Sequence, residues 1–359
     1  YGDCLACDGV LVNRQQRRQL IADAIAAAAS KRDARADLPV EMLEELTDLV
    51  ERPSLIEGAI DDGSLDLPAE VLSTVMRSHQ RYVPLYRRSA EVDPLSLQAR
   101  GCLLPQFLCI ANGLDGAEDS IRRGNERVLK ARLADAAFFL DADRAVASEQ
   151  RRAQLSRVTF AEGLGSLLDR CERLEWLAQT LGRCLALDAA AQADACRGAH
   201  LCKHDLVSQM VGEFPELQGL MGGKYLLAEG EPASVALAVQ EHYLPRGADD
   251  VLPSSDAGAV VALAERLELL LSIFAKGQRP TGSSDPYALR RAGNGILQIL
   301  WERQWRLDLQ DLLQQACNHW AGLLPGFAID PSQLQADLQE FLRQRLISQL
   351  EEQGEAVDL

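Results

Sequence analysis

The chain has 359 residues, and its composition, 47% hydrophobic and 25% charged, is typical of a folded globular protein and excludes general disorder. A formal net charge of −16 argues against a protein that coats nucleic acid without selection, although local basic grooves are compatible with it. Aromatic residues make up only 5%, and alanine and leucine dominate, which favours helix over sheet.

Cysteine usage indicates a reducing compartment, and the apolar runs indicate that the chain does not span a membrane. Nine cysteines are scattered singly except for Cys4-x-x-Cys7, which we interpret as coincidental because no second pair completes a zinc site. An odd number of cysteines without a disulfide framework fits the cytosol. No apolar run approaches the ~20 residues of a membrane span, so we expect a cytoplasmic chain with no membrane partner. Because the chain starts at Tyr1 and not at Met, we also expect a segment of a longer protein.

The first 150 residues are predicted to form a mixed α/β domain, because segments with helical periodicity alternate with short runs of β-forming residues. The predicted helices are 14–30, 41–50 and 67–78, the last with Pro68 in its first turn. Glu51-Arg52-Pro53 is expected to interrupt the pattern. The runs 81–86 and 106–111 are expected to pair as strands, with the polar segment 88–101 as their connection.

From about Ser120 onward the periodicity is helical. The first helix of this region is predicted to bury one apolar stripe, consisting of Val128, Leu129, Leu133, Ala136, Ala137 and Leu140. Further helical stripes cover 164–181, 194–210, 231–241, 258–274, 288–301 and 331–350. No period of 20–50 residues repeats, which excludes a solenoid.

A basic island occupies residues 121–157, where nine basic side chains stand against five acidic ones in an otherwise acidic chain. The basic side chains are Arg122, Arg123, Arg127, Lys130, Arg132, Arg144, Arg151, Arg152 and Arg157. Such an island points to a phosphate-bearing partner. Helix faces laced with ion pairs are an equally good explanation, so both interpretations stay open.

The sequence Lys203-His204-Asp205-Leu206 is the most chemical-looking motif, because adjacent His-Asp is the core of the metal site in helical phosphohydrolases of the HD type. The other ligands are missing. His200 stands four residues back, where it would share a helix face with His204, and Glu265 stands where a later aspartate is wanted. We therefore treat His204 and Asp205 as a degenerate metal candidate, with a hydrogen-bonded helix histidine as the alternative. No phosphate-binding glycine loop or nucleophile elbow is present.

The segment 280–291, PTGSSDPYALRR, predicts a helix start, with Asp285 as the N-cap and Pro286 at the first helical position. Tyr287, Arg290 and Arg291 would then project to one side of that helix. Arginines beside an aromatic ring can hold a phosphate or a base. Docking on an acidic helix of the same chain is the other interpretation.

Several long motifs resemble, in order and over essentially the whole chain, the β subunit of the heterotetrameric, bacterial-type glycyl-tRNA synthetase. The motifs are SHQRY at 78–82 (usually HQKYF in the family), LPQF at 104–107 followed by Ala111-Asn112, GNERVL at 124–129, ARLADA at 131–136 with Phe138-Phe139, MVGEFPELQGLMG at 210–222, EHYLPR at 241–246 and PTGSSDPYALRR at 280–291. The family commonly has Lys-Ala/Cys-Asp-Leu at 203–206 and Ala-Asp-Lys-Leu-Asp at 264–268. Both departures indicate that His204 is incidental.

The resemblance implies an α+β fold with three parts. Residues 1–150 would be a mixed α/β domain similar to one in the phenylalanyl-tRNA synthetase β chain, 151–280 an all-helical HD-like domain, and 281–359 a helical linker leading to a missing anticodon-binding domain. The resemblance also implies an α2β2 assembly in which the α subunit, using ATP and Mg, attaches glycine to tRNA. This chain would then bind tRNA for glycine, hold no cofactor and carry no aminoacylation site.

The residues expected to bind tRNA are Arg122, Arg123, Arg127, Lys130, Arg132, Arg290 and Arg291. We assign no catalytic residue. Two alternatives to tRNA binding stay open, a metal-dependent HD-type phosphohydrolase and a pure structural scaffold that makes no RNA contact.

Overall fold

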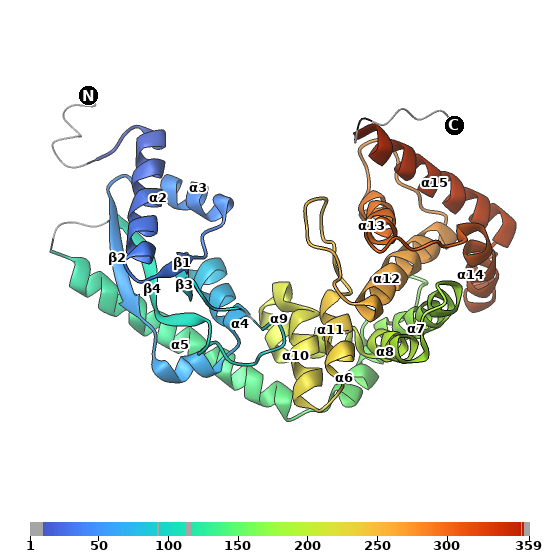
Figure 1. Ribbon diagram of the computed structural model, residues 1–359, viewed down its shortest axis with the longest axis horizontal. Helices are drawn as coiled ribbons and strands as arrows, with labels where there is room; N and C mark the ends of the chain where they lie inside the picture. Colours follow the sequence, from blue (N-terminus) through green and yellow to red (C-terminus); the bar gives the residue numbers. More distant parts are fainter. Residues whose placement is uncertain (1–9, 92, 113–115, 353, 355–359) are drawn as a thin grey trace. The chain divides into compact units, whose positions relative to one another are not determined.

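The computed structural model describes residues 10–91, 93–112, 116–352 and 354, so Cys4 and Cys7 lie outside the described residues. The chain divides into two compact units, Tyr1–Ala145 and Val146–Leu359. The first unit combines helices with a sheet and the second is built of helices (Figure 1). The predicted α+β class is confirmed. The boundaries after residues 150 and 280, and the similarity to the two named domain types, stay predictions.

The described part of the first unit contains a four-stranded antiparallel sheet and three longer helices. Its elements are α2 (Arg14–Ser30), β1 (Ala34–Ala36), α3 (Val40–Leu49), β2 (Pro53–Ala59), α4 (Ala69–Thr74), β3 (Val83–Arg87), β4 (Leu103–Asn112) and α5 (Glu118–Arg144), with short 3-10 and π turns at η1 (Asp62–Asp66) and η2 (Val75–His79). The predicted helices 14–30 and 41–50 and the paired strands 81–86 and 106–111 are confirmed, with shifts of a few residues at their ends.

The sheet order β1-β3-β4-β2 explains why the sequence did not predict two of the strands. Both β1 and β2 are edge strands. β2 begins at Pro53, and an edge strand tolerates proline at its first residue although a central strand does not. The expected interruption at this proline is therefore the start of a strand. Pairing with β4, from Pro53 opposite Asn112 to Ala59 opposite Gln106, holds β2 in place.

Helices cover both faces of the sheet. Helices α2 and α3 bury Ile21, Ile25 and Leu46 against one face, where Leu108 of β4 also lies. On the other face Asn125 of α5 donates a hydrogen bond to the Cys109 sulfur of β4 (3.1 Å), as the alternation of side chains along a strand requires. The buried stripe of α5 is narrower than predicted. It consists of Leu129, Leu133, Ala136 and Leu140, whereas Val128 is 45% exposed.

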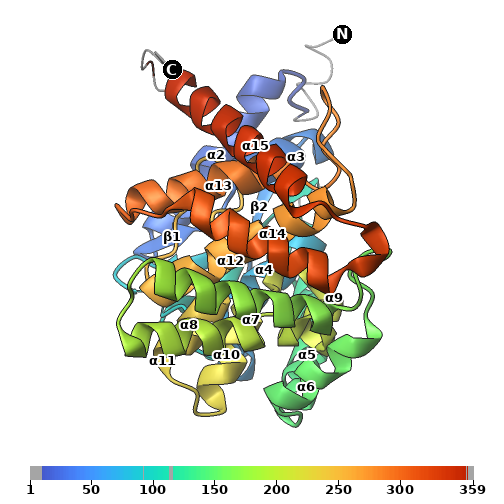
Figure 2. The same ribbon diagram turned by 90° about the vertical axis from the view of Figure 1, so that its right-hand side faces the viewer.

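The second unit is a helical array around one central helix. Its longer elements are α6 (Ser148–Gln154), α7 (Leu167–Cys184), α8 (Ala189–Leu201), α9 (Gln209–Glu213), α10 (Leu220–Ala228), α11 (Ala233–Glu241), α12 (Asp256–Ala275), α13 (Leu289–Glu302), α14 (Leu309–Leu323) and α15 (Pro331–Glu352). Short 3-10 turns lie at η3 (Leu155–Arg157), η4 (His204–Val207), η5 (Pro215–Leu217) and η6 (Pro325–Phe327). Helix α12 contacts α7, α8, α11, α13, α14 and α15, and most of its 20 residues are buried (Figures 1 and 2).

The predicted helix 194–210 is wrong as a continuous element. α8 ends at Leu201, and the turn η4 and the short helix α9 follow it. Among the described residues, the helices α6, α10 and α14 were not predicted. Helix α10 was not predicted because it contains Gly222 and Gly223, and glycine is a poor helix former. Glycine is needed at 223 because α11 packs so closely there that a side chain would clash with the Ala236 carbonyl. Helix α14 had a readable signal, since Asp308 caps it and its buried residues recur at helical spacing.

Candidate functional site

Two of the predicted cations on α5 are engaged in surface ion pairs. Arg122 Nη2 lies 2.8 Å from the Asp119 carboxylate, one turn earlier on the same helix. Lys130 Nζ lies 3.1 Å from the Asp61 carboxylate. All four side chains are largely exposed, and ion pairs of this kind contribute little to stability. These pairs therefore leave both cations able to exchange their partner for a stronger anion.

The other three predicted α5 cations, Arg123, Arg127 and Arg132, are exposed and form no ion pair within the described residues. At ~100° per residue, Arg123, Arg127 and Lys130 lie on one side of the helix at spacing i, i+4 and i+7. Arg132 is rotated by about 140° from Arg127. The five cations thus do not form a single face, and the side with Arg123 and Arg127 is the stronger candidate for an anionic partner.

Of the three basic-island residues in the second unit, Arg151 and Arg152 are used internally. Arg151 is only 2% exposed, and its guanidinium donates to Ser148 Oγ (2.9 Å) and to Glu229 Oε1 (3.1 Å). Arg144 and Arg157 are exposed. The island seen in the sequence is therefore a set of cations with different surroundings.

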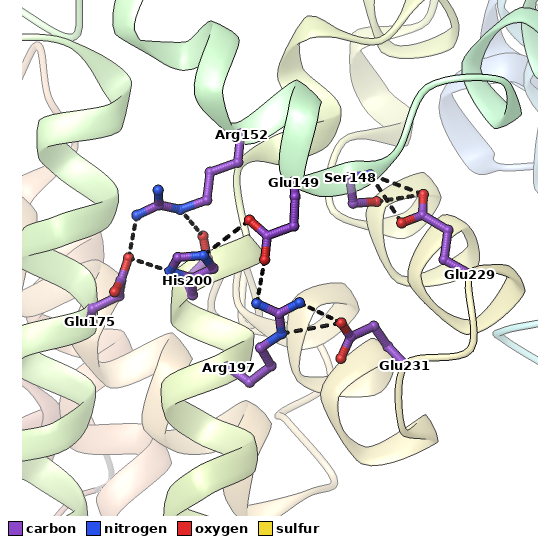
Figure 3. Close-up of polar contacts among 8 residues, drawn as sticks. All are labelled: Ser148, Glu149, Arg152, Glu175, Arg197, His200, Glu229 and Glu231. Atoms are coloured by element: carbon purple, nitrogen blue, oxygen red, sulfur yellow. Dashed lines mark hydrogen bonds and ion pairs between the residues drawn. The ribbon is translucent and has the colours of Figure 1, made fainter.

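Figure 3 shows a polar cluster that ties α6 to α7 and α8. Glu149 of α6 accepts from Arg197 (2.5 Å) and contacts His200 Nε2 (3.3 Å). The other ring nitrogen of His200 lies 2.9 Å from Glu175, which also accepts from Arg152 (2.5 Å). Burial opposes the ionisation of Glu149 and Glu175, but hydrogen bonds from Arg197, Arg152 and His200 outweigh it and lower the pKa of both carboxyls. Arg152 and His200 therefore hold the fold together and are not free for a ligand.

The same cluster extends to the connection between α10 and α11 through two glutamates (Figure 3). The backbone N–H and the hydroxyl of Ser148 donate to Glu229. Arg197 donates to Glu231 as well as to Glu149. The start of α6 is thus fixed by ion pairs and hydrogen bonds to three other segments of the unit.

His204 is fully buried and both of its ring nitrogens are engaged. Arg151 Nε donates to Nδ1 (3.2 Å), and Nε2 lies 3.2 Å from the Gly222 carbonyl oxygen, to which it donates. Burial, followed by the positive charge of Arg151, lowers the pKa of His204 to about 3. The imidazole is therefore neutral at pH 7 and has no nitrogen left for a metal ion.

Asp205 anchors the motif at 210–222. Its Oδ2 accepts from the N–H groups of Gly219 (2.6 Å) and Gly222 (2.9 Å). Burial raises the pKa of Asp205 to about 6 against the opposing effect of these hydrogen bonds. Gly219 has a φ of +77°, which favours glycine, and a side chain at Gly222 would crowd the carboxylate. The glycines of this motif are thus explained by the approach of the backbone to Asp205.

The expected shared face of His200 and His204 is wrong. His200 belongs to α8, which ends at Leu201, whereas His204 lies in the turn η4. Among the described residues, no group of three His, Cys, Asp or Glu side chains is arranged to hold a metal ion. In this structure His204 and Asp205 stabilise packing, and their geometry gives the phosphohydrolase alternative no support.

A buried ionic network, not predicted from the sequence, lies between α7, α12 and Lys203. Glu268 accepts from Arg170 (2.7 Å) and Arg173 (2.8 Å), and Glu265 pairs with Arg170 (2.9 Å) and Lys203 (3.0 Å). Burial opposes the ionisation of Glu265, but the charges of Arg170 and Lys203 outweigh it and lower its pKa to about 2. At the position where an HD-type site would have a metal-binding aspartate, the Glu265 carboxylate is thus neutralised by side-chain cations.

Arg290 and Arg291, which the sequence predicts to project to one side of a helix, contact different backbone carbonyls. The helix α13 begins at Leu289, after Ala288 in the left-handed conformation, and not at Pro286. Asp285 still caps it, by accepting from the backbone N–H groups of residues 289 and 290. Arg290 donates back to the Gly282 carbonyl (2.8 Å), whereas Arg291 donates to the Arg246 carbonyl (3.3 Å).

Arg291 lines a pocket of about 500 Å³ beside α12 and α13, together with Tyr287, Tyr243, Arg246 and Glu265. Arg290 does not line it. Tyr287 and Arg291 were singled out in the sequence by their spacing. Tyr243, Arg246 and Glu265 come from segments distant in the sequence. Tyr243 and Arg246 belong to the EHYLPR motif, which only the family resemblance marks as notable.

In the part of the chain that is described, no helix is both long and apolar enough to cross a lipid bilayer. Residues 1–359 match the family described as glycyl-tRNA synthetase beta subunit. The chain is 43% identical over 344 residues to the glycine–tRNA ligase beta subunit of Acaryochloris marina, covering 96% of this chain and 46% of that protein. It is 43% identical over 352 residues to the Synechocystis sp. protein of the same name, covering 98% and 47%. Identity to that of Moorella thermoacetica is 42% over 359 residues, covering 100% and 50%.

The chain therefore spans about half the length of the curated relatives it matches. The match extends through both compact units. The chain belongs to the glycyl-tRNA synthetase beta subunit family.

Proposed function

We propose that this chain is a tRNA-binding, non-catalytic part of a glycine–tRNA ligase β subunit. The proposal rests on the exposed arginines of α5 in a chain that belongs to this family. Arg123 and Arg127 are exposed, one helical turn apart, and form no ion pair within the described residues. Exposed arginines on one side of a rigid helix are suited to phosphate oxygens. The net charge of −16 confines such binding to local surfaces.

In the proposed assembly the chain works with an α subunit in an α2β2 complex in the cytoplasm. The α subunit uses ATP and Mg to attach glycine to tRNA, and this chain contributes the placement of tRNA. The proposal also includes an HD-like helical domain at residues 151–280, which rests on the family resemblance alone.

The test replaces Arg123 and Arg127 together by glutamate in the β subunit of the whole α2β2 enzyme. Affinity for glycine tRNA is measured at several salt concentrations. Loss of two phosphate contacts is expected to weaken binding at least about tenfold and to reduce the slope of log affinity against log salt by about 1 to 2.

The matched pair of single variants is Arg127→Glu and Arg132→Glu, which reverse one charge each on different sides of α5. A smaller effect is expected for Arg132→Glu than for Arg127→Glu. Equal affinity and equal salt slope in the parent and the Arg123/Arg127 variant would rule this surface out. If, in addition, no cross-link to tRNA formed anywhere in this chain, the scaffold alternative would replace the proposal.

A further inference from the structure

The pocket beside α13 is built entirely within the second unit and is large enough for a mononucleotide. Its volume of about 500 Å³ lies in the range of ordinary small-molecule sites. Its walls come from the segments 216–218, 243–246 and 287–288 and from helices α12 and α13. The inferred tRNA-binding role of α5 does not involve this pocket, because α5 belongs to the first unit.

Aromatic and apolar side chains form part of the wall. Tyr287 is partly exposed, and Tyr243, Leu269 and Pro245 line the same space. The Lys203 ammonium lies 3.9 Å from the centre of the Tyr243 ring and fixes that ring from within the protein. Stacking on tyrosine would stabilise a bound nucleotide whatever its base, because every base has a flat aromatic face.

Two exposed cations line part of the pocket, whose lining also includes the exposed Glu216. Arg246 and Arg291 are exposed, and Arg291 uses one nitrogen to contact the Arg246 carbonyl. A guanidinium has five N–H donors, so this contact leaves donors for an anion. Arg266 also lines the pocket, but it is buried and donates to the carbonyls of Ala262 (2.7 Å) and Pro245 (2.7 Å). Arg266 therefore holds the wall in place, and Arg246 and Arg291 are the groups suited to a phosphate.

Glu265 adds an acceptor with an unused oxygen. Its Oε1 pairs with Arg170 and Lys203, whereas its Oε2 is buried and has no hydrogen-bond partner within the described residues. An unsatisfied buried acceptor is unfavourable, and a charged one more so. Because Glu265 lines the pocket, a donor on a ligand there is the group placed to pair with it. Its low pKa means that the carboxylate can only accept.

We propose that this pocket binds one nucleotide, with the base against the tyrosines, an exocyclic amine of the base donating to Glu265, and the phosphate on Arg246 and Arg291. Cytosine, adenine and guanine carry such an amine. Uracil offers one N–H between two carbonyl oxygens, which a carboxylate repels. The pocket should therefore discriminate against uridine nucleotides.

The nucleotide can be an unpaired residue of tRNA or a free nucleotide, since both present the same chemistry. With tRNA as the source, the inference rests on the function proposed above. With a free nucleotide it does not. The experiments below separate the two sources.

The first experiment titrates the 359-residue chain with CMP, AMP, GMP and UMP by calorimetry. Saturable binding of at least one amine-bearing nucleotide, at least about fivefold tighter than UMP, is expected. Arg291→Ala and Tyr287→Ala should each weaken it about tenfold, as expected for the loss of one charge-assisted or stacking contact. Arg290→Ala is the matched control, because Arg290 is the neighbouring arginine on α13 and does not line the pocket.

Absence of saturable binding by all four mononucleotides would overturn the inference. So would equal weakening by Arg290→Ala and Arg291→Ala, or equal binding of UMP and the other three. Circular dichroism of each variant, compared with the parent, keeps a folding defect from being taken for a binding defect.

The second experiment cross-links glycine tRNA to the whole α2β2 enzyme and compares the parent with Tyr287→Ala. A cross-link near residues 285–292 that is lost in the variant assigns the pocket to RNA. Mononucleotide binding without such a cross-link assigns it to a free nucleotide. If the α5 variants weaken tRNA binding and no nucleotide enters the pocket, the proposed function stands and the pocket inference falls. If a nucleotide binds the pocket and the α5 variants bind tRNA as the parent does, the pocket inference stands and the α5 surface is ruled out.

Discussion

Helices α5 and α7 each carry two arginines about one turn apart, but those of α5 are exposed and those of α7 are mostly buried. Arg123 and Arg127 of α5 are exposed and form no ion pair within the described residues. Arg170 and Arg173 of α7 are mostly buried and share the carboxylate of Glu268. An exposed cation retains its hydration and can exchange it for a phosphate, whereas a buried cation depends on its fixed partner. The first pair is therefore suited to function and the second to stability.

The largest expected effect comes from removing the partner of the buried arginines. Glu268→Ala leaves Arg170 and Arg173 without their shared carboxylate and also removes the acceptor of the Ser272 hydroxyl. Breaking a buried pair in this way typically costs about 3 to 5 kcal/mol. Chemical unfolding followed by tryptophan fluorescence measures it, since Trp176, Trp301, Trp305 and Trp320 all lie in the second unit.

Glu340→Ala is the matched control for this prediction, because Glu340 also pairs with an arginine of the second unit but on its surface. No resolvable change in stability is expected for it. A similar loss in both variants would mean that burial does not separate the two kinds of ion pair.

A smaller effect is expected from pH, through the buried neutral histidine beside Arg151. The pKa of His204 is about 3 in the folded chain against 6.5 as the ordinary value. Between these values the unfolded state binds more protons, so the contribution of His204 to stability falls as the pH falls below 6.5. From pH 6.5 to 5 this loss amounts to about 2 kcal/mol.

The His204→Gln variant isolates this contribution. Asp205, whose pKa is raised to about 6, acts in the opposite direction below that pH because its folded state binds the extra proton. A comparison of the variant with the parent removes the effect of Asp205. The decline in stability of the second unit between pH 7 and 5 should be about 2 kcal/mol smaller in the variant. An equal decline would show that His204 is charged, or accessible, in the folded chain.

The smallest effect is expected on α5. Lys130→Ala removes an exposed ion pair with Asp61, and Arg127→Ala removes an exposed cation without an ion pair. Thermal unfolding followed by circular dichroism should show changes within about 0.5 kcal/mol for each. A loss above about 1 kcal/mol for Arg127→Ala would mean that this arginine supports the fold, which would weaken the proposed RNA surface.

The sequence alone determined the elements whose signal is local. Helices α2, α5, α7, α12 and α15 were predicted because apolar residues recur at the helical period over many turns. The strands β3 and β4 were predicted from short runs of β-forming residues. The motifs that mark the family were equally readable, because they are contiguous.

Tertiary structure alone decided how those elements are used. The strand β2 exists because it pairs with β4, about fifty residues later in the chain. The pairing of α7 with Glu268 joins residues 95 apart, and no local pattern reveals such a contact. His200 and His204 diverge because α8 ends between them, and the pocket arises where 243–246 meets α12 and α13. Packing determines which cations are buried in ion pairs and which are exposed. The buried arginines stabilise the fold, and the exposed ones are those proposed to bind RNA.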